Sequence, residues 1–233
     1  MSKWKDIWSK KTVIEGDSFT LKDLINLDGF DSGGDSFSEA KWLENTSEIA
    51  IKMNLTAEDS VFEVGCGCGA FLWALNSIIK PKEIGGLDFS ENLVKTARYV
   101  FKNNDNFMVS DALDLPTAYK YDYTIAYSVA HYLSFNEVEV VIDKMLDKSR
   151  KGVGLFELPD AAFEREAEQF RMRSMGLNSD EYSQKYEGLR HTYFDYSKIK
   201  GIADRHGYSI ERYNAAGILH GQSQFRFGVI IRK

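Results

Sequence analysis

Short apolar runs alternate with amphipathic segments through the middle of the chain. The apolar runs have the length of buried strands, whereas the segments between them repeat apolar residues at helical spacing. This alternation predicts an α/β fold with a doubly wound, mostly parallel sheet. The strand-like runs cover residues 61–64, 83–88, 106–112, 121–128 and 152–158, and the helical segments begin at 70 and cover 90–101 and 136–146.

The two ends of the chain carry further helical patterns. Trp4, Ile7 and Trp8 share one helical face, a second apolar stripe runs over 21–30, and Ser38 is placed to cap a helix over 39–53. After the fifth strand the pattern becomes charged and helical. It predicts helices over 161–175, 179–186 and 197–206, followed by strands over 207–213 and 225–232 that form an antiparallel pair.

A glycine-rich turn joins the first strand to the helix that follows it. Residues 61–70 read Val-Phe-Glu-Val-Gly-Cys-Gly-Cys-Gly-Ala, with Glu63 two positions before the first glycine. Gly65, Gly67 and Gly69 can adopt positive φ and let a ligand approach the backbone closely. The first N–H groups of the following helix favour a carboxylate or phosphate. The turn therefore predicts a nucleotide-like ligand.

Composition narrows the classes of function. The 233 residues are 43% hydrophobic and 27% charged, which suits one well-buried domain. A net charge of −6 argues against a nucleic-acid partner, and no apolar run reaches the length of a membrane helix. The N-terminus has no secretory signal pattern, and Cys66 and Cys68 lie inside the glycine turn without further metal ligands nearby. We expect a cytoplasmic protein with no bound metal and no membrane partner.

Asp88 follows the glycine turn by about twenty residues, at the end of the second strand. An acid at this separation reaches ribose hydroxyls in nucleotide-binding folds; the alternative is an ordinary strand-end acid. Gly65, Gly67 and Ala70 also satisfy the loose dinucleotide fingerprint. An NAD-dependent oxidoreductase is therefore an alternative that shares the first two features.

The Glu-x-Gly-x-Gly-x-Gly block resembles motif I of the class I S-adenosylmethionine (SAM)-dependent methyltransferases, and the resemblance covers about residues 58–158. It implies the Rossmann-like fold of that family and SAM as the cofactor. It also implies that Asp111 accepts a hydrogen bond from the adenine amine, with Asp114 as a rival. The residues implied at the cofactor are Glu63, Gly65, Cys66, Gly67, Gly69, Asp88, Phe89, Asp111, Ala112 and Ser128.

The same resemblance implies one methyltransferase domain over 1–233. Its parts would be an N-terminal helical cap (1–55), the SAM-binding core (58–158), a helical lid that binds substrate (159–195) and a C-terminal helix with strands (196–233). Within the cap, Phe30, Asp31 and Trp42 would approach SAM or substrate, although Trp42 also suits the hydrophobic core.

Methyl transfer to a hydroxyl or an amine requires a base, whereas a carboxylate or phosphonate is already deprotonated and needs only positioning. His131, at the end of the fourth strand, is the first candidate base; its alternative is a histidine hydrogen-bonded to the backbone. His191 and Tyr193 are further catalytic candidates. Arg226 is either solvated or directed into the pocket from a strand end. Trp42, Tyr132 and Arg226 are the predicted substrate-binding residues, and Gln224 is a further candidate near the pocket.

Residues 186–194 and 224–227 resemble segments of methyltransferases from biosynthetic clusters. This resemblance implies O-methylation of a carboxylate, phosphonate or hydroxyl of a small molecule or peptide, including a peptide C-terminal carboxylate. N-methylation of a small amine is the alternative reaction. A non-catalytic protein on the same scaffold is a third reading, which the intact glycine turn and both acids oppose. We expect a monomer or a homodimer.

Overall fold

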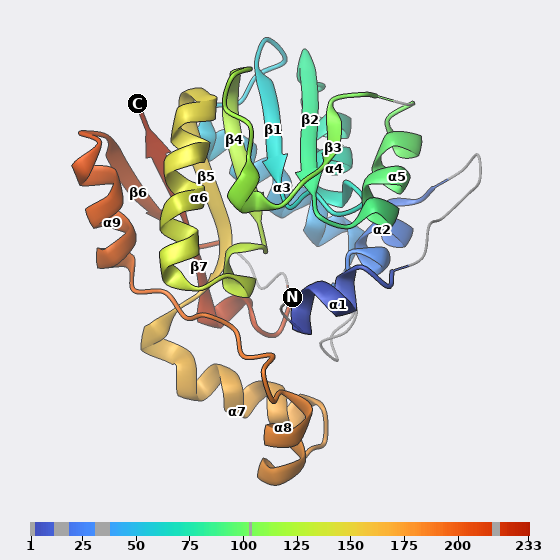
Figure 1. Cartoon of the computed structure of the whole chain (residues 1–233), viewed down its shortest axis with the longest axis vertical. Coiled ribbons are helices and arrows are strands. Elements are labelled where there is room, and N and C mark those ends of the chain that lie inside the picture. Colours follow the sequence, from blue (N-terminus) through green and yellow to red (C-terminus); the bar gives the residue numbers. More distant parts are fainter. Residues whose placement is uncertain (1–2, 12–18, 31–37, 103, 216–219) are drawn as a thin grey trace.

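The computed structural model describes residues 3–11, 19–30, 38–102, 104–215 and 220–233, and it contains one seven-stranded sheet (Figure 1). The strand order is β3-β2-β1-β4-β5-β7-β6, with β1 to β5 parallel and β7 antiparallel to both of its neighbours. The predicted fold class is confirmed. The strands are β1 (Ser60–Val64), β2 (Glu83–Asp88), β3 (Phe107–Val109), β4 (Tyr121–Tyr127), β5 (Ser149–Pro159), β6 (Ser209–Tyr213) and β7 (Arg226–Arg232).

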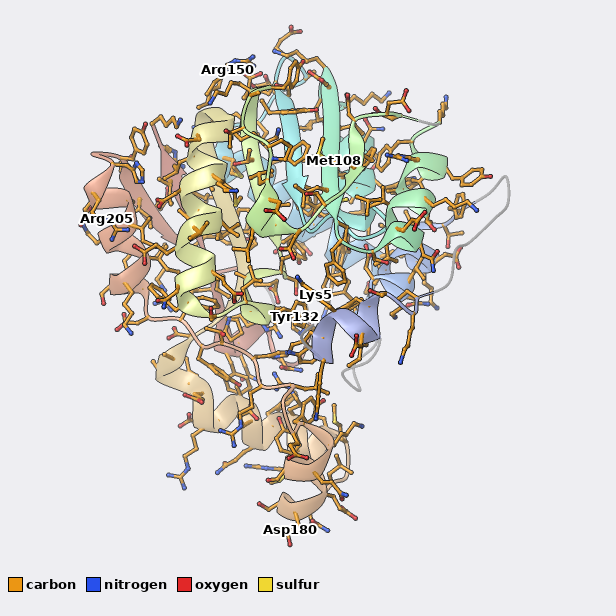
Figure 2. All side chains as sticks on the ribbon, in the orientation of Figure 1. Lys5, Met108, Tyr132, Arg150, Asp180 and Arg205 are labelled. Atoms are coloured by element: carbon orange, nitrogen blue, oxygen red, sulfur yellow. The ribbon has the colours of Figure 1, made fainter. Side chains whose placement is uncertain are left out.

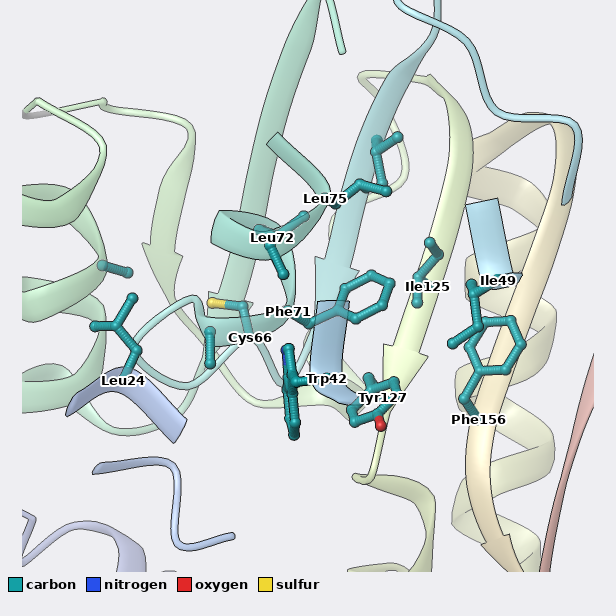
Figure 3. Packing of buried hydrophobic residues seen from close by; sticks show 14 of the residues in the cluster. Leu24, Trp42, Ile49, Cys66, Phe71, Leu72, Leu75, Ile125, Tyr127 and Phe156 are labelled. Atoms are coloured by element: carbon teal, nitrogen blue, oxygen red, sulfur yellow. The ribbon is translucent and has the colours of Figure 1, made fainter. Parts of the chain in front are cut away.

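Helices cover both faces of the sheet, which explains why its central strands read as continuous apolar runs. α3 (Glu39–Met53), α4 (Ala70–Ile78) and α5 (Glu91–Val100) pack on one face. α6 (Phe135–Lys148) and α9 (Tyr196–Arg205) pack on the other. Figure 3 shows the first of these layers, in which Phe71 of α4 stacks on Tyr127 of β4 with ring centroids 5.1 Å apart.

The remaining helices lie beyond the carboxyl ends of the parallel strands. α1 (Lys3–Trp8) runs along this edge, with α2 (Leu21–Leu27) beside it, while α7 (Glu164–Ser174) and α8 (Ser179–Lys185) project farthest from the sheet (Figure 1). No helix within the described ranges is both long and apolar enough to span a bilayer. The arrangement leaves a space between the sheet edge and these four helices.

Several element boundaries differ from the sequence prediction for local reasons. β3 ends at Val109, three residues early, because the Asp111 side chain accepts from the N–H of Leu113 and starts the 3₁₀ turn η1 (Ala112–Asp114). The helix predicted from 161 begins with the 3₁₀ turn η3 (Ala161–Phe163), capped by Asp160. β6 starts at Ser209, because Gly207 has φ +72° and ends the preceding helical turn. Two further 3₁₀ turns are η2 (Ala130–Tyr132) and η4 (Ser223–Phe225).

Candidate active site

A cavity of about 610 Å³ lies at the carboxyl ends of β1, β2, β3 and β4. α1 covers it from one side, and residues from the end of α7 through α8 to His191 close the other. Figure 2 labels Lys5 of α1 and Tyr132 of η2, which both line the cavity, and the ring of Trp4 on α1 packs against Tyr132 with centroids 4.8 Å apart. The hydroxyl of Ser90 and the amide of Asn92 donate to the carbonyls of Trp8 and Lys11, which fixes the C-terminal end of α1 beside α5.

The glycine turn forms one wall, with Gly65, Gly67 and Gly69 at φ values of +71°, +52° and +91°. A Cβ on Gly67 would lie 2.2 Å from Oδ1 of Asp28, so only glycine fits there. Asp28 accepts from the N–H of Cys68 at 2.7 Å and of Ala70 at 3.3 Å. Its carboxyl group therefore accepts hydrogen bonds at the N-terminus of α4, a role that the sequence analysis missed.

Three carboxyl groups face this wall. Oδ2 of Asp88 accepts from the N–H of Gly67 at 3.1 Å and Oδ1 from the N–H of Ser90 at 2.8 Å. Burial raises the pKa of Asp28 to about 7 and that of Asp88 to about 6. Burial, together with the charges of Asp28 and Asp88, raises the pKa of Glu63 well above its usual value. Oε2 of Glu63 has no hydrogen-bond partner among the described residues.

This wall fits SAM better than it fits a dinucleotide. Three desolvated carboxyl groups beside open space favour a ligand with positive charge and hydroxyl donors. SAM carries a sulfonium, an ammonium, one carboxylate and two ribose hydroxyls, so its net charge is positive. The pyrophosphate of NAD brings two negative charges and would meet the Asp28 carboxyl group at the α4 N-terminus. Glu63, Asp28 and Asp88 are placed to hold these groups, and the described residues contain no cluster of three or more potential metal ligands.

Asp111 lies at the far end of the same wall, where both of its oxygens already have partners. Oδ1 accepts from the N–H of Leu113 at 3.0 Å, and Oδ2 pairs with Nζ of Lys5. Burial alone would raise the pKa of Asp111, but the contacts with Lys5 and Leu113 outweigh it and hold the pKa below its usual value. An adenine amine would have to share this carboxylate with Lys5.

The other predicted cofactor residues divide into two groups. Most of them line the cavity, and Gly69 instead forms the N-cap of α4. Ser128 has φ +58° at the end of β4, a strained conformation typical of functional sites. Asp31 lies outside the described residues, and Phe30 lines the cavity. The lining members of the predicted cofactor set are Glu63, Gly65, Cys66, Gly67, Asp88, Phe89, Asp111, Ala112 and Ser128.

Two histidines meet at the opposite end of the cavity. The rings of His131 and His191 form an edge contact with centroids 4.4 Å apart, and Trp4 of α1 stacks on His191 at 5.1 Å. Thr192 holds this segment in place, since its N–H donates to the His131 carbonyl and its hydroxyl to the Leu133 carbonyl. The structure thus brings together candidates that are sixty residues apart in the sequence.

Both histidines are neutral at physiological pH. Burial lowers the pKa of His131 and of His191 well below the usual value, and the positive charges of Arg171 and Arg226 lower both further. Nδ1 of His131 is buried and has no hydrogen-bond partner among the described residues. This nitrogen therefore does not make the hydrogen bond to the backbone that the alternative interpretation of His131 expected.

Tyr193 and Gln224 do not reach the cavity. The Tyr193 hydroxyl donates to Oε1 of Glu168 on α7 at 2.6 Å, and Gln224 is exposed and donates to the Gly221 carbonyl. Gln222 lines the cavity in place of Gln224. Proximity in sequence to His191 was therefore a poor guide to the position of the Tyr193 side chain.

Arg226 is buried, with only 9% of its side chain exposed, so the solvated alternative is wrong. Its guanidinium donates to the carbonyl of Glu157 at 3.3 Å and lies 3.5 Å from the Glu157 carboxylate. Glu157 also accepts from Nε2 of His220 at 2.7 Å and has φ +62° at a register shift in β5. Although burial raises the pKa of Glu157, His220 and Arg226 outweigh it and hold the pKa below its usual value.

Trp42 packs in the hydrophobic core and also lines the cavity. Only 1% of it is exposed, and its ring packs against Phe30 at 4.7 Å and Tyr127 at 5.3 Å as part of the core, yet one side lines the cavity. Sequence reasoning also missed Trp4, Lys5 and Arg171 as parts of the site. The apolar face of α1 was visible in the sequence, but nothing in it indicated which surface that face would cover.

Comparison with protein-family models finds a match for part of the chain. Residues 61–152 match a family model described as a methyltransferase domain. A search of curated proteins gives no match.

The fold is shared with solved methyltransferases at low sequence identity. Magnesium protoporphyrin IX methyltransferase (ChlM) from Synechocystis PCC 6803, solved with bound SAM, superposes with a TM-score of 0.58 at 17% identity over 100% of this chain and 92% of that one. N-methyltransferase NodS from Bradyrhizobium japonicum WM9 gives 0.58 at 15% identity over 84% and 98%. The plantazolicin methyltransferase BpumL, in complex with S-adenosylhomocysteine, gives 0.60 at 15% identity over 89% and 88%.

Proposed function

We propose that this chain, which is a class I SAM-dependent methyltransferase with the predicted fold and cofactor, transfers the methyl group of SAM to an oxygen atom of a small molecule or peptide. The proposed acceptor is a carboxylate, with phosphonates and hydroxyls as related acceptors. A peptide C-terminal carboxylate belongs to this class.

The observation that carries the proposal is the division of charge within the cavity. The acids Asp28, Glu63, Asp88 and Asp111 line its glycine-turn end, where SAM brings positive charge. The lining residues from Met175 to the C-terminal end of the described chain include the cations Lys185 and Arg226 and the imidazole donors His191 and His220, and no acid. The other charged lining residues are Lys5, Lys11 and Glu137. Opposite charges in the two halves favour a cationic cofactor in one and an anionic acceptor in the other.

Bound SAM would supply a methyl group on a sulfonium; an acceptor lone pair attacks the methyl carbon in line with the C–S bond, which breaks to release S-adenosylhomocysteine. The protein then has to align the acceptor with the methyl group and exclude water, and a cavity between the sheet edge and the surrounding helices suits both tasks. An acceptor carboxylate is already ionised at neutral pH, so it needs donors rather than a base. Arg226 and His191 are placed as those donors, and the aromatic rings of Trp4 and Tyr132 restrict water.

His131 gives the same cavity a way to use a protonated acceptor. Its neutral ring lines the cavity and is the candidate to take a proton from a hydroxyl or an ammonium, although burial and the nearby cations make it a weaker base than a free imidazole. This observation also favours the second candidate reaction, N-methylation of a small amine, and one structurally similar protein, NodS, is an N-methyltransferase. The charge of the lining residues favours the oxygen acceptor over the amine.

The further parts of the proposal concern organisation and setting. We propose one domain in which residues 1–55 form the cap, 58–158 the SAM-binding core, 159–195 the lid and 196–233 the C-terminal unit. The proposed partners are the small-molecule or peptide substrate and, at most, a second copy of the chain, in a biosynthetic role in the cytoplasm. The acidic net charge of −6 supports an acceptor other than nucleic acid.

A screen with trideuteromethyl-SAM tests the proposal. Pooled carboxylic acids, phosphonates, phenols, amines and peptides are incubated with the protein, and products that gain the heavy methyl group are found by mass spectrometry. A methyl ester releases labelled methanol in mild base, whereas an ether, an N-methyl amine or a phosphonate monoester keeps the label. Labelled amines without labelled oxygen acceptors would contradict the proposal. His131→Ala distinguishes a base-dependent acceptor, since it slows transfer to a hydroxyl and spares transfer to a carboxylate.

A further inference from the structure

Arg171 of α7 lies behind His191, outside the cavity, at the centre of a buried hydrogen-bond network. Only 4% of its side chain is exposed. Its guanidinium contacts Oε1 of Glu168 at 3.0 Å, the Tyr182 hydroxyl at 3.3 Å and Oε1 of Gln222 at 3.0 Å. The fourth contact joins Nη2 of Arg171 to Nδ1 of His191 at 2.9 Å. One side chain therefore connects α7, α8, the His191 segment and the turn before β7.

The contact with His191 fixes where the imidazole carries its proton. A guanidinium has only donors, so Nδ1 of His191 must be the acceptor in this pair. A proton on Nδ1 would place two donors against each other, which excludes both the Nδ1–H tautomer and the imidazolium. The remaining form is a neutral ring with its proton on Nε2.

The rest of the site leaves Nε2 for the cavity. His191 lines the cavity while Arg171 does not, and no described residue accepts a hydrogen bond from Nε2 of His191. Trp4 stacks on the ring at 5.1 Å and His131 contacts its edge at 4.4 Å, so its orientation is held from both sides. His191 therefore presents an N–H donor to the cavity and cannot accept a proton there.

We propose that Arg171 is a positioning residue that fixes His191 as an Nε2–H donor, and that this donor, together with Arg226, binds an anionic oxygen of the acceptor. This rests on the proposed function for the identity of the acceptor, but the state of His191 does not depend on it. The two neighbouring histidines thus have different roles: His131 keeps an unpartnered ring nitrogen that can accept a proton, whereas His191 only donates. An acceptor with an exposed carboxylate or phosphonate oxygen fits His191, and an ammonium does not.

The hydrogen bonds of Glu168 make the contact between Arg171 and His191 depend on α7 and α8. Glu168 accepts from the hydroxyls of Tyr182 and Tyr193, each at 2.6 Å, in addition to Arg171. The charge of Arg171 is thereby balanced inside α7 and α8 rather than by an acid in the cavity. The packing of α7 and α8 beside the His191 segment is what places the guanidinium against His191.

Nitrogen-15 NMR of the imidazole rings measures the tautomer directly in the full chain with S-adenosylhomocysteine bound. We expect His191 to show an unprotonated Nδ1 and a protonated Nε2, unchanged across neutral pH. In Arg171→Met, which keeps the buried volume but removes the donor, we expect His191 to populate the Nδ1–H or imidazolium form. Arg173→Met is the matched control, because Arg173 is on the same helix but exposed and contacts only Gln169 in the described structure; it should keep the wild-type spectrum.

Binding is tested with methylphosphonate as the probe. Millimolar methylphosphonate should shift the His191 Nε2–H signal saturably in the wild type and in Arg173→Met, and much less in Arg171→Met. Once an acceptor is known, Arg171→Met should raise its KM about tenfold or more, the range for one lost hydrogen bond to a charged group, with SAM affinity unchanged. Arg171→Lys, which keeps a charged donor, should restore part of the loss.

Several results would overturn the inference. A wild-type His191 that is protonated on Nδ1, a tautomer that Arg171→Met leaves unchanged, or a Nε2–H signal that ignores methylphosphonate would each do so. If Arg171→Met fails to fold, the wild-type spectrum and Arg171→Lys still decide the point. An amine acceptor with the His191 tautomer intact would instead contradict the proposed O-methylation and leave the positioning role of Arg171 in place.

Discussion

The three buried acids at the glycine turn, Asp28, Glu63 and Asp88, predict that SAM binding releases protons. Without the cofactor, burial keeps the pKa of Asp28 at about 7 and that of Asp88 at about 6, far above the usual value of 3.8. A sulfonium and an ammonium placed beside these groups favour their ionised forms and return their pKa values toward the normal range. Protons held by the free protein near neutral pH must then leave on binding.

The size of the effect follows from these values. At pH 6.5 a carboxyl with a pKa of about 7 is roughly three-quarters protonated, and one with a pKa of about 6 is roughly one-quarter protonated. Binding should therefore release about one proton per SAM at pH 6.5, with any contribution from Glu63 adding to it. The dissociation constant should fall about tenfold between pH 6 and pH 7, because deprotonation accompanies binding.

Calorimetric titration in two buffers with different ionisation enthalpies measures this proton release. Asp28→Asn should reduce it by about three-quarters of a proton at pH 6.5, since the neutral side chain has nothing to release. Asp23→Asn is the matched control: Asp23 is exposed on the preceding helix, and its hydrogen bonds from the Thr20 side chain and backbone hold its pKa below the usual value, so it is ionised in both states. Equal proton release from the wild type and Asp28→Asn, or proton uptake on SAM binding, would refute this account of the buried acids.

Three further predictions follow from single positions. Asp88→Ala should weaken SAM binding by ~1–3 kcal/mol, because the N–H groups of Gly67 and Ser90 lose their acceptor; unchanged calorimetric affinity would remove Asp88 from the site. Gly67→Ala should weaken SAM binding more than tenfold, since its Cβ would lie 2.2 Å from Asp28. Gly201→Ala is the control: it has open space around it on α9, so it should leave binding unchanged and stabilise the fold by ~0.5–1 kcal/mol. Equal SAM binding by the two variants would contradict the role of the glycine turn. Burial lowers the pKa of Lys148 to about 8, so the charged form is disfavoured on folding and the contribution of Lys148 to stability should rise between pH 8 and 10.5. Urea titrations of Lys148→Met should lack this rise, and parallel pH curves would refute it.

The sequence predicted the sheet well because its signals were local. Every strand of the parallel part ends at, or one residue before, a polar or glycine residue at the same edge of the sheet. The spacing from the glycine turn to Asp88 is set by one helix and one strand. The same locality explains why His131, in the turn η2 soon after β4, lines the cavity as the sequence indicated. These features depend on residues close together in the chain, which patterns can capture.

The parts that sequence reasoning missed depend on contacts between distant segments. Asp28 reaches the glycine turn across forty residues, and Lys5 reaches Asp111 across more than a hundred. Arg171 acquires its role only because α7 packs against the His191 segment. Arg226 was misjudged as possibly solvated because strand alternation says which way a side chain points but not what covers that face.

The most direct test of the whole account is a crystal structure of the full chain with S-adenosylhomocysteine. The account predicts the amino-acid end of the ligand between the glycine turn, Asp28 and Glu63, the ribose on Asp88, and open space among His131, His191 and Arg226 for the acceptor. A ligand seated over Arg226 and His191, or found outside the cavity, would contradict it.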